Sequence, residues 1–133
     1  MAHPGHPVEE GLEYVADWVN DDEPYPLQVK TGSLIALPYT VELNDIPVHL
    51  VRNQGSLGFH DMIRAEFETL YEEGKTRAKI LTMSMHPYIS GVAHRAGYLD
   101  KALAYLKGQP GVIFMRGVDI LDGYRTVAKS RKA

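Results

Sequence analysis

The chain of 133 residues has no cysteine, a single tryptophan, no excess of basic residues and no long hydrophobic run. The absence of cysteine excludes disulfides, thiol catalysis and zinc sites made of cysteine ligands. The 14 Lys and Arg against 17 Asp and Glu give a net charge of -3, so we expect no nucleic-acid partner. A membrane helix needs about 20 consecutive apolar residues, and no run approaches that length, so we expect no membrane partner.

The composition is that of an ordinary globular protein, with 44% hydrophobic and 23% charged residues. The first ten residues have neither the basic nor the apolar region of a secretory signal. We therefore expect one cytoplasmic domain over residues 1–133, with mobile ends at residues 1–6 and 126–133.

Hydrophobic periodicity predicts strands and helices in alternation along the chain. Apolar segments typical of buried strands are Leu12–Val19, Lys79–Met85 and Val112–Met115. Helical spacing of apolar residues occurs in Phe59–Glu73, His94–Lys107 and Val118–Tyr124. Leu27–Val29 and Leu34–Leu37 flank a turn and predict a short β-hairpin. Between Pro38 and Gly58 the chain is rich in loop residues.

This alternation predicts an α/β fold with mostly parallel strands covered by helices. Crossovers of this kind build either a doubly wound sheet or part of a (β/α) barrel. In both folds the functional edge is the carboxyl end of the strands. Three polar clusters are expected there: the loop at residues 20–22, His86 and the turn around Arg116.

His86 and Asp17 are the two candidates for catalysis. His86 directly follows an apolar strand and precedes Pro87, which ends that strand. Imidazole transfers protons near neutral pH, so His86 suits general acid or base catalysis, the alternative being a structural histidine that caps the strand. Asp17 lies inside the first strand and could orient this imidazole, the alternative being a solvent-facing residue of an edge strand.

The candidate substrate contacts lie in loops and at the start of a helix. Asp and Asn are common in loops for turn formation alone, so both interpretations stay open for them. Arg95 follows the start of a helix, where it could hold a carboxylate or pair with an acid from the loops. The set consists of Asp21, Asp22, Tyr25, Asn44, Asp45 and Arg95. No paired-histidine metal pattern, phosphate-binding loop or nucleophile elbow occurs, so no metal ligands are assigned.

Three segments, in this order, resemble the C-terminal half of polysaccharide deacetylase family proteins, most closely the branch of allantoinase-type amide hydrolases. They are YVADWVNDDEPY (residues 14–25), LPYTVELNDIP (residues 37–47) and MSMHPYISGVAHR (residues 83–95), and PGVIFMRGVDILDGY (residues 110–124) extends the match. The resemblance implies a partial (β/α) barrel lobe. It also implies hydrolysis of non-peptide C–N bonds, in N-acetylated sugars or in cyclic amides and ureides.

Within this resemblance, His86 matches the family's general acid. Asp17 and Trp18 match the second half of a motif, Asp-x-x-Asp-Trp, whose Asp tunes that histidine, while Tyr14 replaces the first Asp. The family's base, its metal-binding residues and the Arg that positions the base belong to N-terminal motifs that this sequence lacks. The resemblance therefore implies no cofactor in this chain, and a divalent metal such as zinc only together with the missing half.

Two kinds of function stay open. The chain is either the C-terminal part of such a hydrolase, acting on a small-molecule amide or an N-acetylated sugar, or a non-catalytic lobe that oligomerises or binds a ligand. Half a barrel exposes sheet edges, which favours a homo-oligomer or pairing with a separate N-terminal half. A third possibility is an independent α+β dimer, which the strand order would reveal, because a barrel lobe has parallel neighbours joined by helices.

Overall fold

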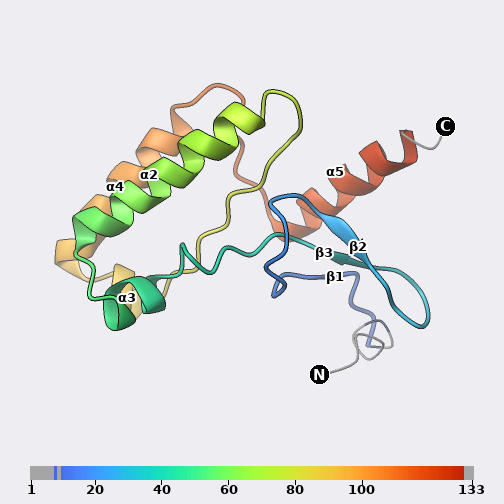
Figure 1. The fold of residues 1–133 in the computed structure, drawn as a ribbon, viewed down its shortest axis with the longest axis horizontal. Coiled ribbons are helices and arrows are strands. Elements are labelled where there is room, and N and C mark those ends of the chain that lie inside the picture. Colours follow the sequence, from blue (N-terminus) through green and yellow to red (C-terminus); the bar gives the residue numbers. More distant parts are fainter. Residues whose placement is uncertain (1–7, 9, 131–133) are drawn as a thin grey trace. The chain divides into compact units, whose positions relative to one another are not determined.

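The computed structural model describes Val8 and residues 10–130, so the predicted mobile end at residues 1–6 lies outside the described residues. The chain divides into two compact units (Figure 1). We call residues 1–39 with 115–133 the sheet unit and residues 40–114 the helical unit. Among the described residues, no helix combines the length and the apolar character that crossing a membrane requires.

The sheet unit contains three short strands and one helix. The strands are β1 (Tyr14–Val15), β2 (Tyr25–Leu27) and β3 (Leu34–Ala36), and the helix is α5 (Gly117–Ser130). Their order is β1-β3-β2, with β3 parallel to β1 and antiparallel to β2. The β2–β3 pair confirms the predicted hairpin, and Gly32 in its turn has a positive φ of 75°, which glycine adopts without strain.

Helix α5 closes a small core within the sheet unit. Leu121 packs with Ile35 and Leu37, which belong to β3 and the residues that follow it. Tyr14, Ile120 and Tyr124 cover this cluster while partly exposed. All three residues of β3 are buried, as expected for the central strand.

The helical unit is built on two long helices that lie side by side (Figure 1). Its elements are η1 (Ile46–Val51), α2 (Ser56–Glu73), α3 (Pro87–Ser90) and α4 (Ala93–Lys107). Helices α2, α4 and α5 confirm the three predicted helices. The π-helix η1 lies in the region expected to be loop-rich, so that expectation missed a helical element.

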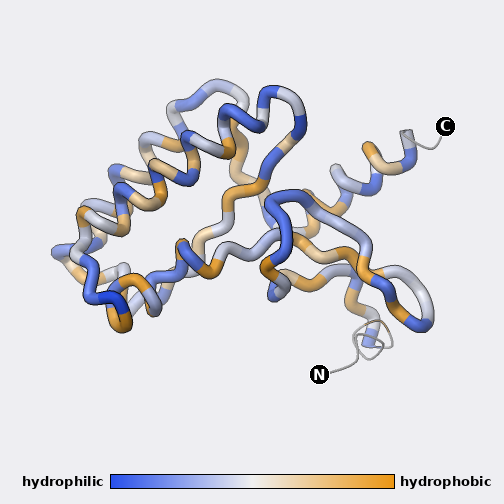
Figure 2. Tube along the Cα trace, in the orientation of Figure 1, coloured by the Kyte–Doolittle hydropathy of each residue, from blue (hydrophilic) through white to orange (hydrophobic). Residues whose placement is uncertain are grey.

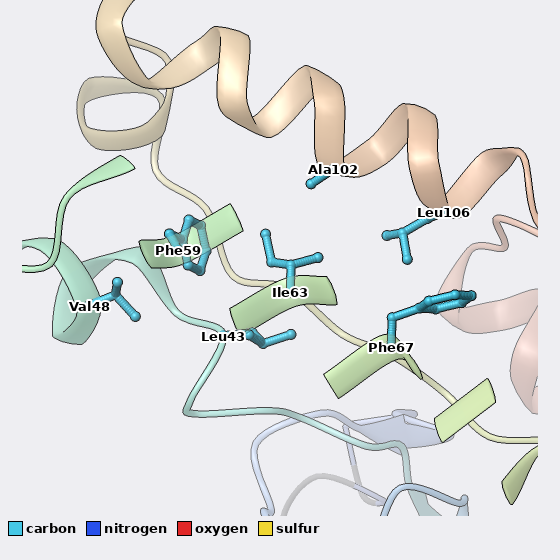
Figure 3. Packing of buried hydrophobic residues seen from close by; sticks show 7 residues of the cluster. All are labelled: Leu43, Val48, Phe59, Ile63, Phe67, Ala102 and Leu106. Carbon is cyan, nitrogen blue, oxygen red and sulfur yellow. The ribbon is translucent and has the colours of Figure 1, made fainter. Parts of the chain in front are cut away.

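The core of the helical unit lies between α2, α4 and the chain before α2 (Figure 3). The helical spacing of Phe59, Ile63 and Phe67 places all three on one face of α2. Opposite them lie Ala102 and Leu106 of α4, and Leu43 and Val48 complete the cluster. Apolar and polar stretches alternate along both helices (Figure 2). Burying a side chain of the size of Leu or Ile contributes about 1.5–3 kcal/mol.

The predicted strands are shorter than expected or missing. Leu12–Val19 contains only the two residues of β1. The segment 79–85 is extended, but only Ser84 pairs, in an isolated parallel bridge with Asn44, and 112–115 belongs to no strand. Leu81, Met83 and Val112 instead pack their side chains on the helical core. A strand needs a neighbour for its backbone groups, which an apolar sequence alone cannot supply. The described chain is thus mixed α/β with a small mixed sheet, not a closed barrel.

Candidate active site

His86 lies where the extended segment 79–85 ends and α3 begins. Its backbone is extended (φ −112°, ψ 127°), and Pro87 occupies the start of α3, where no N–H donor is needed. The N–H groups of Ile89 and Ser90 both donate to the carbonyl oxygen of His86 at 2.9 Å. This tight turn brings residue 90 next to residue 86 on the same side of the chain.

The β-bridge between Asn44 and Ser84 places Asp45 beside His86. The N–H of Ser84 donates to the carbonyl of Leu43 at 3.0 Å, and the N–H of Asp45 donates to the carbonyl of Ser84 at 3.1 Å. The two segments run parallel at this point, so the residues that follow the bridge emerge together. Asp45 and His86 are 41 positions apart in the sequence and adjacent in space.

The Asp45 carboxylate accepts three short hydrogen bonds. Its Oδ1 lies 2.7 Å from Nδ1 of His86, and its Oδ2 accepts the backbone N–H of His86 and the hydroxyl of Ser90, each at 2.7 Å. Asp45 is fully buried and Ser90 is nearly so. We call these three residues the Asp45–His86–Ser90 cluster.

The hydrogen bonds keep Asp45 ionised in spite of its burial. Burial alone would raise the pKa of Asp45, but the backbone and side-chain bonds from His86 and the bond from Ser90 lower it below its ordinary value of 3.8. A carboxylate can only accept hydrogen bonds, so Nδ1 of His86 carries the proton. The free nitrogen for chemistry is therefore Nε2.

The side chain of His86 is 35% exposed, although its Nδ1 lies against the buried carboxylate of Asp45. The ring of Tyr88 lies edge-on at 5.6 Å between centroids. A buried carboxylate on Nδ1 stabilises the imidazolium and holds the ring, as the acid of a catalytic triad does. The cluster is therefore suited to donating or accepting a proton at Nε2.

Three of the predicted substrate contacts, Asn44, Asp45 and Arg95, belong to the helical unit, and the structure shows the bonds that each one makes. Asp45 is buried on Nδ1 of His86, the position that the sequence assigned to Asp17. Asn44 uses its Oδ1 to accept the N–H of Ile46 at 3.0 Å, a turn-forming bond. Arg95 is half-buried, and its guanidinium donates to the carbonyl of Ile89 at 3.1 Å. This bond ties α4 to α3.

The other predicted site residues belong to the sheet unit. Asp17 is exposed, and Asp21 accepts the N–H of Glu23 at 3.2 Å. Asp22 and Tyr25 are half-buried. The hydroxyl of Tyr25 is buried and has no hydrogen-bond partner among the described residues. The roles expected for these four residues stay predictions.

Ser90 and Tyr88 are the site residues that sequence reasoning missed. Ser90 follows His86 by four positions, and Pro87 between them favours the start of a helix. Residues four apart are neighbours on a helical turn, so the string HPYIS carried a signal for the contact between Ser90 and the histidine site. Asp45 gave no such signal, because its contact with His86 is not local.

Ser90 is one of the residues that line a small cavity. Its volume is about 10 Å³, and its lining includes His49, Ser90 and Arg95. A space of that size holds about one water molecule. Among residues 8 and 10–130, no group of three or more His, Asp or Glu side chains is placed to hold a metal ion.

The structure resembles solved structures of polysaccharide deacetylase type over part of their length. No family model matches the chain, and no curated protein does. One similar structure, from Pseudomonas aeruginosa PAO1 and described as a polysaccharide deacetylase, has a TM-score of 0.79 and 30% identity. The match covers 85% of this chain and 39% of that one.

The second similar structure is the Puue allantoinase, with a TM-score of 0.82 and 31% identity over 90% of this chain and 40% of that one. A protein from Mycobacterium smegmatis, also described as a polysaccharide deacetylase, has a TM-score of 0.80 over 94% of this chain and 45% of its own. Its identity of 23% supports the fold alone. The chain thus spans about two fifths of the length of these structures, and the resemblance to the polysaccharide deacetylase family is confirmed.

Proposed function

We propose that the chain is the C-terminal part of a hydrolase for non-peptide C–N bonds, in which it supplies the general acid, His86. The observation that carries this proposal is the buried Asp45 carboxylate 2.7 Å from Nδ1 of a histidine whose side chain is 35% exposed. The similarity to an allantoinase and to a polysaccharide deacetylase supports the choice of C–N bonds. The substrate is a small-molecule amide, a cyclic ureide or an N-acetylated sugar.

In this proposal water attacks the amide carbon and forms a tetrahedral intermediate. The proton on Nε2 of His86 passes to the leaving nitrogen, the C–N bond breaks and the amine departs. Asp45 holds the ring through Nδ1 and stabilises the imidazolium that precedes transfer. The base that activates the water belongs to the N-terminal motifs that this sequence lacks, so turnover requires a second segment or a separate polypeptide.

The substrate contacts that the sequence predicts in the sheet unit stay proposals. Asp21, Asp22 and Tyr25 of the sheet unit are kept as proposed substrate contacts, and Asp17 as a proposed catalytic residue. The buried hydroxyl of Tyr25 supports a polar role, because a buried donor without a partner is costly.

The sharpest test is a hybrid in which this chain replaces the matching segment of the Puue allantoinase. Removing a general acid costs roughly 10²–10⁴-fold in rate. We therefore expect the hybrid to hydrolyse allantoin and His86→Gln to lower kcat at least about 100-fold. Circular dichroism of each variant checks that the fold is kept.

The matched control is His94→Gln, which removes an exposed histidine at the start of α4. We expect it to leave kcat unchanged. An active hybrid that tolerates His86→Gln would contradict the assignment of His86, and so would a folded hybrid that is inactive with His86 in place.

A non-catalytic, oligomerising lobe is the second candidate, and one observation favours it. Val51, Ile113 and Phe114 of the helical unit are 72%, 72% and 61% exposed. Large exposed apolar side chains favour association with another chain. Sedimentation of the purified chain tests this: a concentration-dependent dimer that Phe114→Ser abolishes would support the candidate, and a monomer at all concentrations would contradict it.

A further inference from the structure

We infer that Ser90 is a positioning residue, whose hydroxyl fixes the orientation of the Asp45 carboxylate and, through it, the tautomer and direction of His86. This inference rests on the proposed role of His86 and adds a residue to it. The hydroxyl of Ser90 bonds Asp45 and acts on the imidazole ring of His86 only through that carboxylate.

Among the described residues, Ser90 provides the one hydrogen bond found to the Asp45 carboxylate from a residue other than His86. Two of the three donors belong to His86 itself, its backbone N–H and its Nδ1–H. These two donors move with the residue that must be held. The hydroxyl of Ser90 arrives from the other end of α3 and bonds Oδ2 at 2.7 Å. His86 holds Oδ1 and Ser90 holds Oδ2, so the carboxylate cannot rotate freely about its Cβ–Cγ bond. Its plane is kept in the orientation in which Oδ1 faces Nδ1 of His86.

Burial makes the Ser90 hydroxyl hard to replace. Asp45 is 0% and Ser90 3% exposed, so bulk water does not reach the bond between them. Without the hydroxyl, Oδ2 would keep only the backbone N–H of His86. A buried charged acceptor that loses a donor bears the full desolvation cost of that bond. The carboxylate would then rotate towards other donors or accept a proton.

The backbone around Ser90 holds its hydroxyl in place. The guanidinium of Arg95 donates to the carbonyl of Ile89, and Ile89 is fully buried. Gly91 is the C-cap of α3, and a Cβ at that position would lie 2.4 Å from the carbonyl oxygen of Pro87, so a larger residue would force the backbone to shift. The turn therefore ends directly after Ser90 with its last residues held by neighbouring elements. These contacts fix the backbone position from which the Ser90 hydroxyl reaches Asp45.

Nuclear magnetic resonance of the isotope-labelled chain tests the inference without any substrate. We expect Ser90→Ala to raise the titration midpoint of the Asp45 carboxyl by about one pH unit, because a hydrogen bond to a charged group is lost. The Nδ1–H proton of His86 should exchange with water about tenfold faster, and its signal should move upfield. Ser90→Thr keeps the hydroxyl and should restore both readouts.

The matched control is Ser84→Ala, which removes a hydroxyl from the same stretch of chain while leaving the backbone bonds of Ser84 in place. Within the described residues, no hydrogen bond of the Ser84 hydroxyl is found, so both readouts should stay unchanged. If Ser90→Ala does not fold, Ser90→Cys serves instead, since a thiol keeps the volume and is a weak donor. We expect changes in the same direction with the thiol.

A folded Ser90→Ala or Ser90→Cys chain whose Asp45 titration and Nδ1–H exchange match the wild type would overturn the inference. So would a Ser90→Thr chain that behaves like Ser90→Ala. The proposed function fails on a different measurement, the effect of His86→Gln on the allantoinase hybrid. The two failures are therefore distinguishable.

Discussion

The helical unit and the sheet unit differ in the size of their buried clusters and in how far their elements depend on neighbours for backbone hydrogen bonds. In the helical unit, α2 and α4 share one cluster with Leu43 and Val48 that buries seven residues. In the sheet unit, strands of two or three residues meet one helix, and the corresponding cluster buries Ile35, Leu37 and Leu121. A helix satisfies its own backbone hydrogen bonds, whereas a strand depends on its neighbours. The comparison shows that stable packing is concentrated around α2 and α4.

The largest expected effect is on the core between α2 and α4. Ile63→Ala should lower the free energy of unfolding by about 4 kcal/mol, because it empties a fully enclosed position. Leu121→Ala should cost less, about 2.5 kcal/mol, because its small cluster can collapse around the loss. Urea unfolding of the two variants measures both values. If Leu121→Ala lowered the free energy of unfolding as much as Ile63→Ala or more, stable packing would not be concentrated around α2 and α4.

The second largest effect on the free energy of unfolding is expected for a buried carboxylate, Asp45 of the helical unit, compared with an exposed one, Asp17 of the sheet unit. Asp45→Asn should lower the free energy of unfolding at pH 7 by about 3 kcal/mol, since it weakens buried charge-assisted bonds. Asp17→Asn, at an exposed position, should change it by less than about 0.5 kcal/mol. Equal effects of the two changes would contradict the assignment of Asp45 as the structural partner of His86.

The Asp45 change also has a pH signature. The pKa of Asp45 is below 3.8 in the folded chain and returns to that ordinary value on unfolding. Its stabilisation is therefore complete above pH 3.8 and is lost as the pH falls through the lower folded value. The difference in stability between the wild type and Asp45→Asn should narrow in that acidic range. Urea unfolding at a series of pH values measures this, and a constant difference would contradict it.

The weakest interaction compared is the ion pair between Arg125 of α5 and Glu13. The two charged groups are 2.7 Å apart and partly exposed, so water screens their attraction. Arg125→Ala should change the free energy of unfolding by less than about 1 kcal/mol. A double-mutant cycle with Glu13→Ala measures the pair. A coupling of several kcal/mol would show that the sheet unit relies on this contact more than its core suggests.

The sequence was enough to predict elements whose bonds are local. The apolar spacing of α2, α4 and α5 and the turn of the β2–β3 hairpin lie within short stretches of chain, and the structure confirms them. The strands expected at 79–85 and 112–115 had the right composition, but pairing partners cannot be read from composition. The same segments bury Leu81 and Val112 against helices instead.

The candidate site was also predictable only where its features depend on residues that are close in the sequence. The position of His86 was predicted from an apolar segment ended by proline, and the family resemblance implied the role that is proposed for it. The choice of Asp45 over Asp17 as the residue on Nδ1 depends on a contact across 41 positions, which no local pattern reports. Ser90 was within reach of spacing arguments, since it follows His86 by one helical turn.

The bridge between Asn44 and Ser84 limits which changes of chain length the site can accept. Successive side chains of an extended segment point to opposite sides, so one residue inserted between Ser84 and His86 would turn the imidazole away from Asp45. One residue inserted in the exposed turn at 74–78 leaves the bridge and everything after it in register. Natural or engineered variants should therefore vary in length before residue 79 and keep a constant length from 84 to 90.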